Sequence, residues 1–184
     1  MSAVLENSFT DKAFRYDIET YHKLSATGIL PRNTELIHGI VVKKMTISPK
    51  HSKVVTKLGH ILAQAISENR IVRQEKPITI GDSEPEPDIS AVEGTYDDFG
   101  DKHPDTAAFV VEVALSSYED DLYKADIYAS ANISIYWILD LQNNKIEIFE
   151  KPIRGKYTLH TTHSADEKLQ LPLTNRTISL AELV

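Results

Sequence analysis

The stretch Ala107-Ala108-Phe109-Val110-Val111-Glu112-Val113-Ala114-Leu115 decides the fold class of this 184-residue chain. It is apolar on both faces of a strand, which is typical of a central strand covered by helices on both sides. Glu112 interrupts the run, and an unpaired carboxylate loses its hydration in such a place. We therefore predict a central strand of an α/β fold that carries a functional acid.

Working outward, Pro87-Asp88 opens a second apolar run, residues 89–92. Residues 86–92 predict a strand in which Glu86 and Asp88 point to the same face. Asp88 at the start of this strand and Glu112 within the next one can face each other across a sheet. Lys124 falls on the predicted helix 119–131. Two carboxylates with a lysine nearby suggest a site for a hard divalent cation.

The chemistry suited to such a site is phosphodiester hydrolysis. It needs a nucleophilic water and stabilisation of the charge that builds on the phosphoryl oxygens. Mg²⁺ supplies both when carboxylates hold it and leave positions open, and a lysine can position the water or bind the phosphate. Position 114 shares the strand face of Glu112 but is alanine, so we expect Lys124 to reach the site from the helix. Asp120, Lys124 and Tyr128 follow one another at the four-residue spacing of a helix face.

The remaining elements surround this centre. Before it lie a helix at 17–26 with Asp17 as its cap, strands on either side of Gly39, a long helix that starts at Ser48-Pro49, and a strand at 71–80. After it come strands at 133–139, 145–150 and 157–162, and a short strand with a helical turn in 171–184. The order helix, strand, strand, strand, helix, strand predicts a mixed α/β sandwich around one sheet.

Composition narrows the class of protein. The chain has 41% hydrophobic residues and no cysteine, so thiolate zinc sites and cysteine nucleophiles are excluded. Neither a linker nor a repeat divides it, so we expect one domain, 1–184, with residues 1–14 poorly ordered. Residues 1–10 have no signal-peptide pattern, and no apolar run has the length of a membrane span. We expect a cytoplasmic protein that does not enter membranes.

The distribution of charge matters more than the net charge of −7. Residues 43–76 contain eight basic and two acidic residues, a net charge of +6. Residues 82–126 contain fourteen acidic and two basic residues, a net charge of −12. This pattern fits a phosphate-binding rim beside a metal centre, and it also fits a solvated helix face followed by acidic loops.

In the order and spacing of its motifs, the chain resembles the Uma family of putative restriction endonucleases, a branch of the PD-(D/E)XK nuclease superfamily. The resemblance covers residues 15–184. The matching pieces are Glu35-Leu36-Ile37-His38-Gly39, Ser48-Pro49 with His51, Pro87-Asp88-Ile89, Val111-Glu112-Val113, Ser116, Asp120 with Lys124 and Tyr128, and Tyr136-Trp137-Ile138-Leu139-Asp140. A catalytic lysine displaced from the strand onto the helix is a feature of that family.

The resemblance implies a restriction-endonuclease-like core and a site for Mg²⁺ or Mn²⁺. By position, Asp88 and Glu112 match the metal-binding carboxylates and Lys124 matches the catalytic lysine. Glu35 matches an acidic position near the site that can add a metal contact, and His51 matches a histidine to which no role is assigned. The chain departs from the family pattern in its turns, where it has His38 before Gly39, Ser116-Ser117-Tyr118, and Ala131-Asn132.

Three functions stay open at this point. The first is a metal-dependent endonuclease that acts on DNA, with Lys50, His51, Lys53 and Lys57 contacting phosphates and a homodimer cutting both strands. The second is a catalytically silent nuclease-fold protein that binds nucleic acid or a partner. The third is a structural homo-oligomer. Taken singly, the residues have simpler interpretations: Lys124 as an exposed helix lysine paired with Asp120, and Glu84 and Glu86 as members of a solvated loop.

Overall fold

The apolar stretch around Glu112 forms β5 (Phe109–Ala114), a fully buried strand inside a six-stranded sheet of order β3-β4-β5-β6-β7-β8. The computed structural model describes residues 12–44 and 47–184. The other strands are β3 (Arg70–Gln74), β4 (Ile89–Glu93), β6 (Ile135–Asp140), β7 (Lys145–Ile153) and β8 (Lys156–Ser164). β5 and β6 are parallel, and every other neighbouring pair is antiparallel. The central position predicted for this strand is confirmed.

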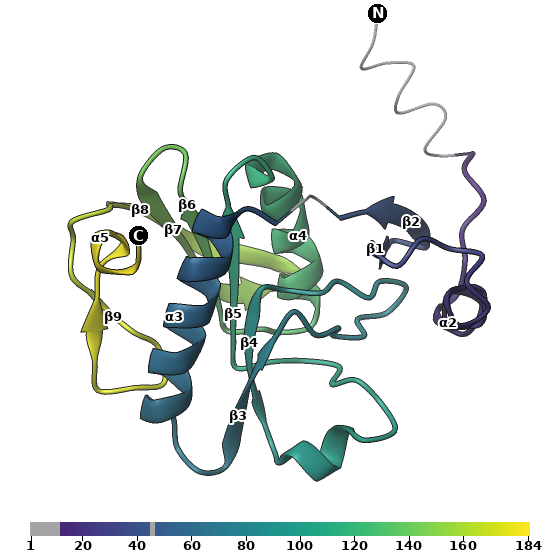
Figure 1. The fold of residues 1–184 in the computed structure, drawn as a ribbon, viewed down its shortest axis with the longest axis horizontal. Coiled ribbons are helices and arrows are strands. Elements are labelled where there is room, and N and C mark those ends of the chain that lie inside the picture. The colour runs from purple at the N-terminus through teal and green to yellow at the C-terminus, as the bar shows by residue number, and fades with distance from the viewer. Residues whose placement is uncertain (1–11, 45–46) are drawn as a thin grey trace, which may run out of the picture. The chain divides into compact units, whose positions relative to one another are not determined.

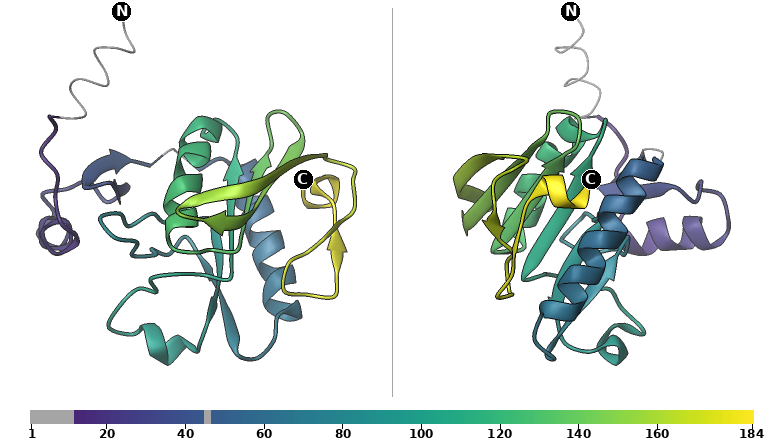
Figure 2. Two further views of the ribbon diagram at one scale, coloured as in Figure 1. Left: turned by 180° about the vertical axis from the view of Figure 1, so that it is seen from behind. Right: turned by 60° about the vertical axis from the view of Figure 1, so that its left-hand side comes forward.

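Two helices cover the sheet, α3 (Pro49–Ala65) on one face and α4 (Tyr118–Ser130) on the other (Figures 1 and 2). α4 is the crossover between the parallel strands β5 and β6, as such a connection requires. Ser48 caps α3 by accepting a hydrogen bond from the His51 amide, 3.2 Å away, and Pro49 occupies the first turn, where it has no intrahelical N–H to lose. The order α3, β3, β4, β5, α4, β6 confirms the predicted restriction-endonuclease-like core.

The main core lies between α3 and the sheet. Val54, Val55, Leu58 and Leu62 recur at helical spacing and are all buried. They belong to one apolar cluster with residues of β5 and β6, including Trp137. Burial of each such side chain is worth roughly 1.5–3 kcal/mol. This core packs the sheet against α3, whereas the α4 side combines buried residues such as Tyr128, Tyr136 and Ile138 with the buried Glu112 and Lys124.

The chain divides into two compact units. The sheet unit contains the described residues 47–80 and 86–184, and the hairpin unit contains 12–44 and 81–85. In the hairpin unit, α2 (Ile18–Ala26) is capped by Asp17 as predicted, and β1 (Thr34–Ile37) pairs with β2 (Ile40–Lys43). His38 and Gly39 both have positive φ, 49° and 73°, which suits the two-residue turn of a hairpin. The predicted pair of strands is therefore confirmed.

Two strands are shorter than expected. β3 ends at Gln74 rather than near residue 80, because Glu75 takes a positive φ of 50° and Pro77 has no N–H for a ladder. β4 begins at Ile89 rather than residue 86, after Pro85 and Pro87. The expectation that Glu84 is solvated was wrong: it is 3% exposed and accepts a hydrogen bond from His22 Nε2 at 2.6 Å inside the hairpin unit.

The C-terminal part extends the sheet unit. β7 and β8 are each nine residues long, longer than predicted, and are followed by β9 (Leu169–Gln170), β10 (Thr177–Ile178) and α5 (Leu180–Leu183). A 3₁₀ turn, η1 (Tyr96–Phe99), lies in the acidic loop after β4. Among the described residues, every helix is too short or too polar to cross a bilayer. The prediction about residues 1–14 falls mostly on residues 1–11, which lie outside the described ranges.

Candidate active site

The two predicted acids meet where the ladder between β4 and β5 ends. The last backbone pair is Ile89 with Val111, and beyond it the side chains take over the hydrogen bonding. The Asp88 amide donates to Glu112 Oε2 at 3.1 Å, and the Val113 amide donates to Asp88 Oδ2 at 2.7 Å. Each carboxylate is therefore held by a backbone N–H of the other strand. This reciprocal arrangement ties each acid to the backbone of the neighbouring strand.

Glu112 is 3% exposed, and both of its oxygens accept hydrogen bonds. Oε1 accepts from Lys124 Nζ at 3.2 Å and from the Tyr128 hydroxyl at 2.8 Å. Both donors lie on α4, one turn apart. A buried carboxylate is tolerated when charge-assisted bonds of this kind replace its hydration. The structure thus brings Asp88, Glu112 and Lys124 together in the sheet unit.

Lys124 is buried, with 8% of the residue exposed, so its interpretation as a solvent-facing lysine was wrong. Its partner on α4 is Asp121, at 3.6 Å, and not Asp120, which is exposed. Asp121 is itself buried and accepts a hydrogen bond from the Ser117 hydroxyl at 2.7 Å. The ammonium therefore lies between two buried carboxylates. The small Ala114 side chain in β5 is consistent with a lysine that arrives from the helix.

Tyr136 on β6 contacts α4 from the sheet. Its hydroxyl donates to the Asp121 carbonyl oxygen at 2.8 Å, and its ring packs on that of Tyr128 with centroids 4.9 Å apart. Burial, followed by the negative charges of Asp121 and Glu112, holds the pKa of Tyr136 well above its usual value of 10.0. Tyr136 therefore stays a neutral donor. Asp121 was missed by the sequence analysis, although its three-residue spacing to Lys124 is a signal that could have found it.

His51, on the first turn of α3, reaches the same site. Its Nε2 lies 3.1 Å from Asp88 Oδ2, and its buried Nδ1 has no hydrogen-bond partner in the part of the chain that the structure describes. This pattern assigns the N–H to Nε2. Burial by itself would lower the pKa of His51, but the hydrogen bond and charge of Asp88, helped by Glu75 and Asp121, raise it above the usual 6.5. His51 thus contacts a predicted metal ligand.

The donor set suits a hard divalent cation. Asp88 Oδ1 accepts no hydrogen bond from the described residues, so one carboxylate oxygen keeps both lone pairs. Glu112 adds the second carboxylate at the same strand end. Mg²⁺ is commonly bound by one or two carboxylates with waters and substrate phosphates in the other positions. Asp88 and Glu112 therefore fit the cation that the sequence predicted.

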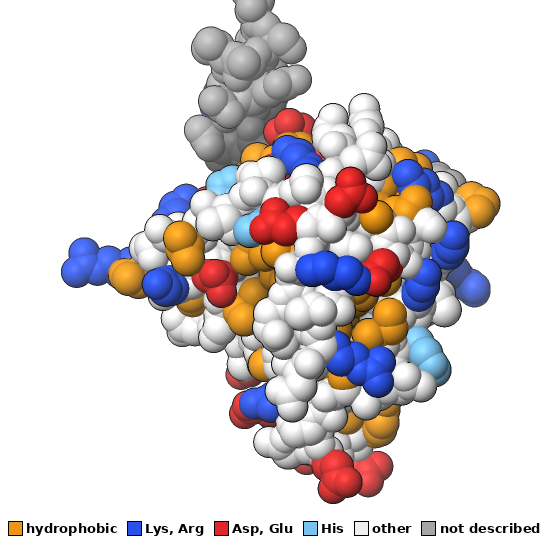
Figure 3. All heavy atoms as spheres, turned by 90° about the vertical axis from the view of Figure 1, so that its left-hand side faces the viewer, with side chains coloured by type: hydrophobic (Ala, Val, Ile, Leu, Met, Phe, Trp, Pro, Cys, Tyr) orange, Lys and Arg blue, Asp and Glu red, His pale blue; other side chains and the backbone are white. Residues whose placement is uncertain are grey.

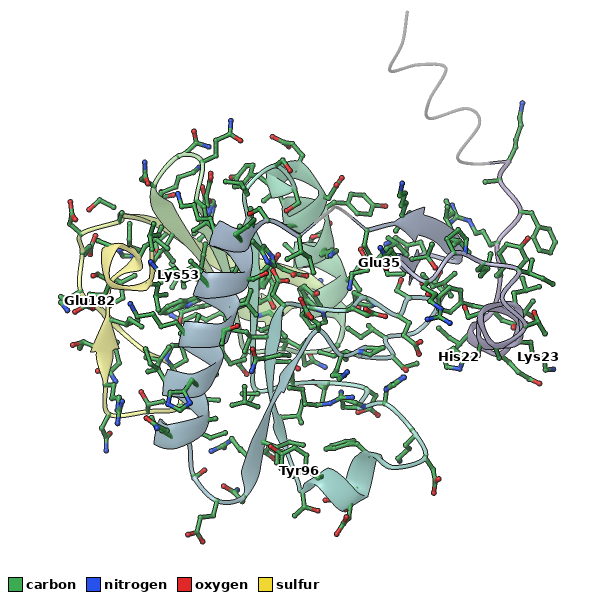
Figure 4. The ribbon with its side chains drawn as sticks, in the orientation of Figure 1. His22, Lys23, Glu35, Lys53, Tyr96 and Glu182 are labelled. Atoms are coloured by element: carbon green, nitrogen blue, oxygen red, sulfur yellow. The ribbon has the colours of Figure 1, made fainter. Side chains whose placement is uncertain are left out.

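The three lysines predicted to contact phosphates have acceptors within the sheet unit. Lys50 Nζ donates to the Leu141 carbonyl at 3.3 Å, Lys53 Nζ to the Val184 carbonyl at 2.7 Å, and Lys57 Nζ to the Glu182 carbonyl. Figure 4 shows Lys53 on the side of α3 toward α5. Basic and acidic side chains are interspersed on the face that carries these elements (Figure 3). Phosphate contacts by these lysines stay a prediction.

Glu35, the fourth predicted catalytic residue, belongs to the hairpin unit. It lies on β1 and is 6% exposed (Figure 4). Asp88, Glu112, Lys124, Tyr128 and His51 all belong to the sheet unit. A catalytic role for Glu35 stays a prediction.

The order α3, β3, β4, β5, α4, β6 around a mixed sheet places the protein in the restriction-endonuclease-like class of folds, with two acids and a buried lysine at the end of β4 and β5. Residues 18–181 match the family Uma2, described as "Putative restriction endonuclease". Because this match spans most of the chain, the protein belongs to that family.

Solved structures support the fold. One is described as "a putative nuclease belonging to DUF820 from Anabaena variabilis ATCC 29413". It is 15% identical to this chain, with a TM-score of 0.65 over 87% of this chain and 96% of that one. At this identity the likeness shows the fold alone. No curated protein matches the chain.

Proposed function

We propose that this protein is a metal-dependent endonuclease that hydrolyses DNA phosphodiester bonds. The observation that carries the proposal is the closed network of Asp88, Glu112 and Lys124 at the shared end of β4 and β5. Glu112 and Lys124 are buried and Asp88 is partly buried, and burying charged groups together costs free energy that their mutual contacts must offset. Membership of the Uma2 family supports nuclease chemistry for this network.

In this proposal, Asp88 and Glu112 hold Mg²⁺ or Mn²⁺. The cation supplies Lewis-acid stabilisation of the phosphoryl oxygens and a water of lowered pKa. Asp88 Oδ1 offers the open coordinating position, and the Val113 amide fixes the orientation of that carboxylate through Oδ2. The Asp88 amide does the same for Glu112 Oε2.

Lys124 has the second role. Its ammonium is held between Glu112 and Asp121, where it can orient the attacking water and neutralise the negative charge that grows on the phosphoryl group. The Tyr128 hydroxyl shares Glu112 Oε1 with Lys124 and so restricts the rotation of that carboxylate. His51 restrains Asp88 from the opposite face of the sheet. A homodimer would place two such sites on the two strands of a duplex.

The test is a cleavage assay with the full chain on supercoiled, linear and single-stranded DNA, in Mg²⁺ and in Mn²⁺. We expect nicking or cutting that EDTA abolishes and that Asp88→Asn and Lys124→Ala each reduce about 100-fold or more. Calorimetry with Mn²⁺ should show binding to the wild type that Glu112→Gln weakens.

Asp120→Asn is the matched control. It removes an exposed carboxylate from α4 beside the buried Asp121, and cleavage should be unchanged. Cleavage that survives Asp88→Asn or Lys124→Ala would contradict the proposal. Binding of DNA without Mn²⁺ binding or cleavage would instead identify a catalytically silent nuclease fold.

A further inference from the structure

A second cation lies on the same face of the sheet as the candidate site. Arg73 on β3 is paired directly with Ser90 on β4, two residues from Asp88. Directly paired residues and alternate residues of a strand share a face. The pairing continues past Ser90, since the Glu75 amide donates to the Asp88 carbonyl at 3.1 Å. Arg73 and Asp88 are therefore diagonal neighbours, with Cα atoms roughly 7–8 Å apart.

The Arg73 guanidinium is half-buried between two loops. Its Nη1 donates to the Pro77 carbonyl at 2.9 Å, in the loop after β3. Its Nη2 lies 3.5 Å from His103 Nδ1, and its carbon lies 5.5 Å from the centre of the Phe99 ring, both in the loop after β4. A guanidinium has five N–H donors. These contacts use only part of that capacity.

Arg73 also has no counter-ion in the part of the chain that the structure describes. No carboxylate among residues 12–44 and 47–184 lies within ion-pair distance of it. Burial lowers the pKa of the Arg73 guanidinium, and no acidic side chain among the described residues opposes this effect. By contrast, Arg70 on the same strand pairs with Glu93 at 3.0 Å. A partly desolvated, unneutralised guanidinium is an unfavourable arrangement that binding of an anion would relieve.

We propose that Arg73 is a phosphate-binding residue that receives a nucleic-acid phosphate neighbouring the one positioned at Asp88 and Glu112. This inference rests on the proposed function, because it takes the site at Asp88 as the place where the scissile phosphate lies. The planar fork of Arg73 suits two oxygens of one phosphate. The Phe99 ring and the Pro77 carbonyl hold the fork in place before the phosphate arrives.

The experiment measures binding separately from cutting. Full-length wild type, Arg73→Gln, Arg73→Lys and the control Arg70→Gln are titrated against a fluorescein-labelled DNA duplex in EDTA, by anisotropy. The titration is repeated from about 50 to 200 mM KCl to obtain the salt slope. Arg73→Gln should raise Kd about tenfold at low salt and reduce the slope by about one unit. Arg73→Lys should keep the slope, and Arg70→Gln should change neither quantity.

Thermal melting of each variant separates this role from a structural one. Were Arg73 merely a clamp for Pro77, Arg73→Gln would lower Tm and leave the affinity and slope as in the wild type, which overturns the inference. If Arg73→Gln does not fold, Arg73→Lys decides instead. A lysine keeps the charge but loses the fork, so Kd should still rise severalfold, and an unchanged Kd overturns the inference.

The two proposals fail in different ways. If the wild type cuts DNA but Arg73→Gln binds as tightly as the wild type, the nuclease proposal stands and the Arg73 inference falls. If the wild type binds DNA with the Arg73-dependent slope yet cuts no substrate in Mg²⁺ or Mn²⁺, the nuclease proposal falls and Arg73 stands as a residue that binds a DNA phosphate. A wild type that binds no DNA at low salt overturns both.

Discussion

Two buried glutamates on one face of the sheet accept hydrogen bonds from similar donors, but they differ in the carboxylates that surround them. Glu112 on β5 and Glu147 on β7 are both 3% exposed and flank Ile138 of β6 in a single row. Glu112 accepts from a lysine and a tyrosine hydroxyl, and Glu147 accepts from Lys145, from the Tyr118 hydroxyl and from His160. Burial alone therefore does not mark the candidate site.

The surrounding acids make the difference. Near Glu147, Asp140 accepts three hydrogen bonds from its own turn, made by Gln142 and Asn143, so its oxygens are used locally. Near Glu112, Asp88 Oδ1 accepts no hydrogen bond from the described residues, and Asp121 is a third carboxylate, 3.6 Å from Lys124 Nζ. The Glu112 group therefore contains three carboxylates and the Glu147 group two. An oxygen such as Asp88 Oδ1 can coordinate a cation.

The largest expected difference comes from the two glutamates themselves. Glu112→Gln should reduce metal-dependent DNA cleavage about 100-fold or more, because it removes a charge that the cation requires. Glu147→Gln should leave cleavage within about twofold of wild type and lower the free energy of unfolding by about 1–3 kcal/mol. Cleavage rates and urea unfolding of both variants test this. Equal loss of cleavage in the two would break the comparison.

The two lysines offer the next contrast. Lys124→Met leaves Glu112 and Asp121 facing each other without a cation, so we expect cleavage to fall about 100-fold and stability to fall by about 3 kcal/mol. Lys145 is more exposed, and Lys145→Met should cost about 1 kcal/mol of stability with no loss of cleavage. The same two assays apply. A Lys124→Met protein that cuts at the wild-type rate would exclude Lys124 from the chemistry.

The two tyrosines should differ less. Tyr128→Phe removes one donor from Glu112 Oε1, and we expect about 1 kcal/mol of destabilisation and a cleavage rate reduced severalfold. Tyr118→Phe removes a donor from Glu147 and should change stability by a similar or smaller amount while cleavage is unchanged. Steady-state cleavage at saturating Mg²⁺ measures the effect. Identical rates for both variants would show that the Tyr128 hydroxyl does not position Glu112.

The smallest effect concerns pH. Burial alone would raise the pKa of Glu147, but its hydrogen bonds from Lys145, His160 and Tyr118 outweigh burial and lower it below the usual 4.5. A lowered pKa means that this group stabilises the fold fully above pH 4.5 and loses that contribution as pH falls through the folded-state value. The stability gap between wild type and Glu147→Gln should therefore shrink as pH falls from 6 to 3 (unfolding by urea). A gap that widens on acidification would contradict the assignment.

The sequence predicted the order of elements because its signals are local. Residues 107–115 are apolar on both faces, Asp17 and Ser48 cap their helices, and the spacing of Val54, Val55, Leu58 and Leu62 is helical. The limits of β3 and β4 were less predictable, since they depend on the positive φ of Glu75 and on two prolines whose effect requires knowledge of the neighbouring strand.

The sequence singled out three residues that the structure brings together, but it did not predict the contacts that they make. Asp88, Glu112 and Lys124 were identified, and the structure joins them, yet the sequence paired Lys124 with Asp120 rather than Asp121. Neighbouring residues on a helix point in directions about 100° apart. No local feature of the sequence determines which of Asp120 and Asp121 faces the sheet. The approach of His51 to Asp88 depends on how α3 packs against β4, which no motif encodes.

The crossed bonds between the two acids and the two backbones have one further consequence. The amide protons of Asp88 and Val113 are bonded to carboxylates rather than to carbonyl groups, so their solvent exchange depends on the charge and occupancy of those carboxylates. The exchange rates of these two backbone amide protons therefore depend on whether a cation is bound at the site. Exchange monitored by NMR at these two positions would register a cation before any substrate is cut.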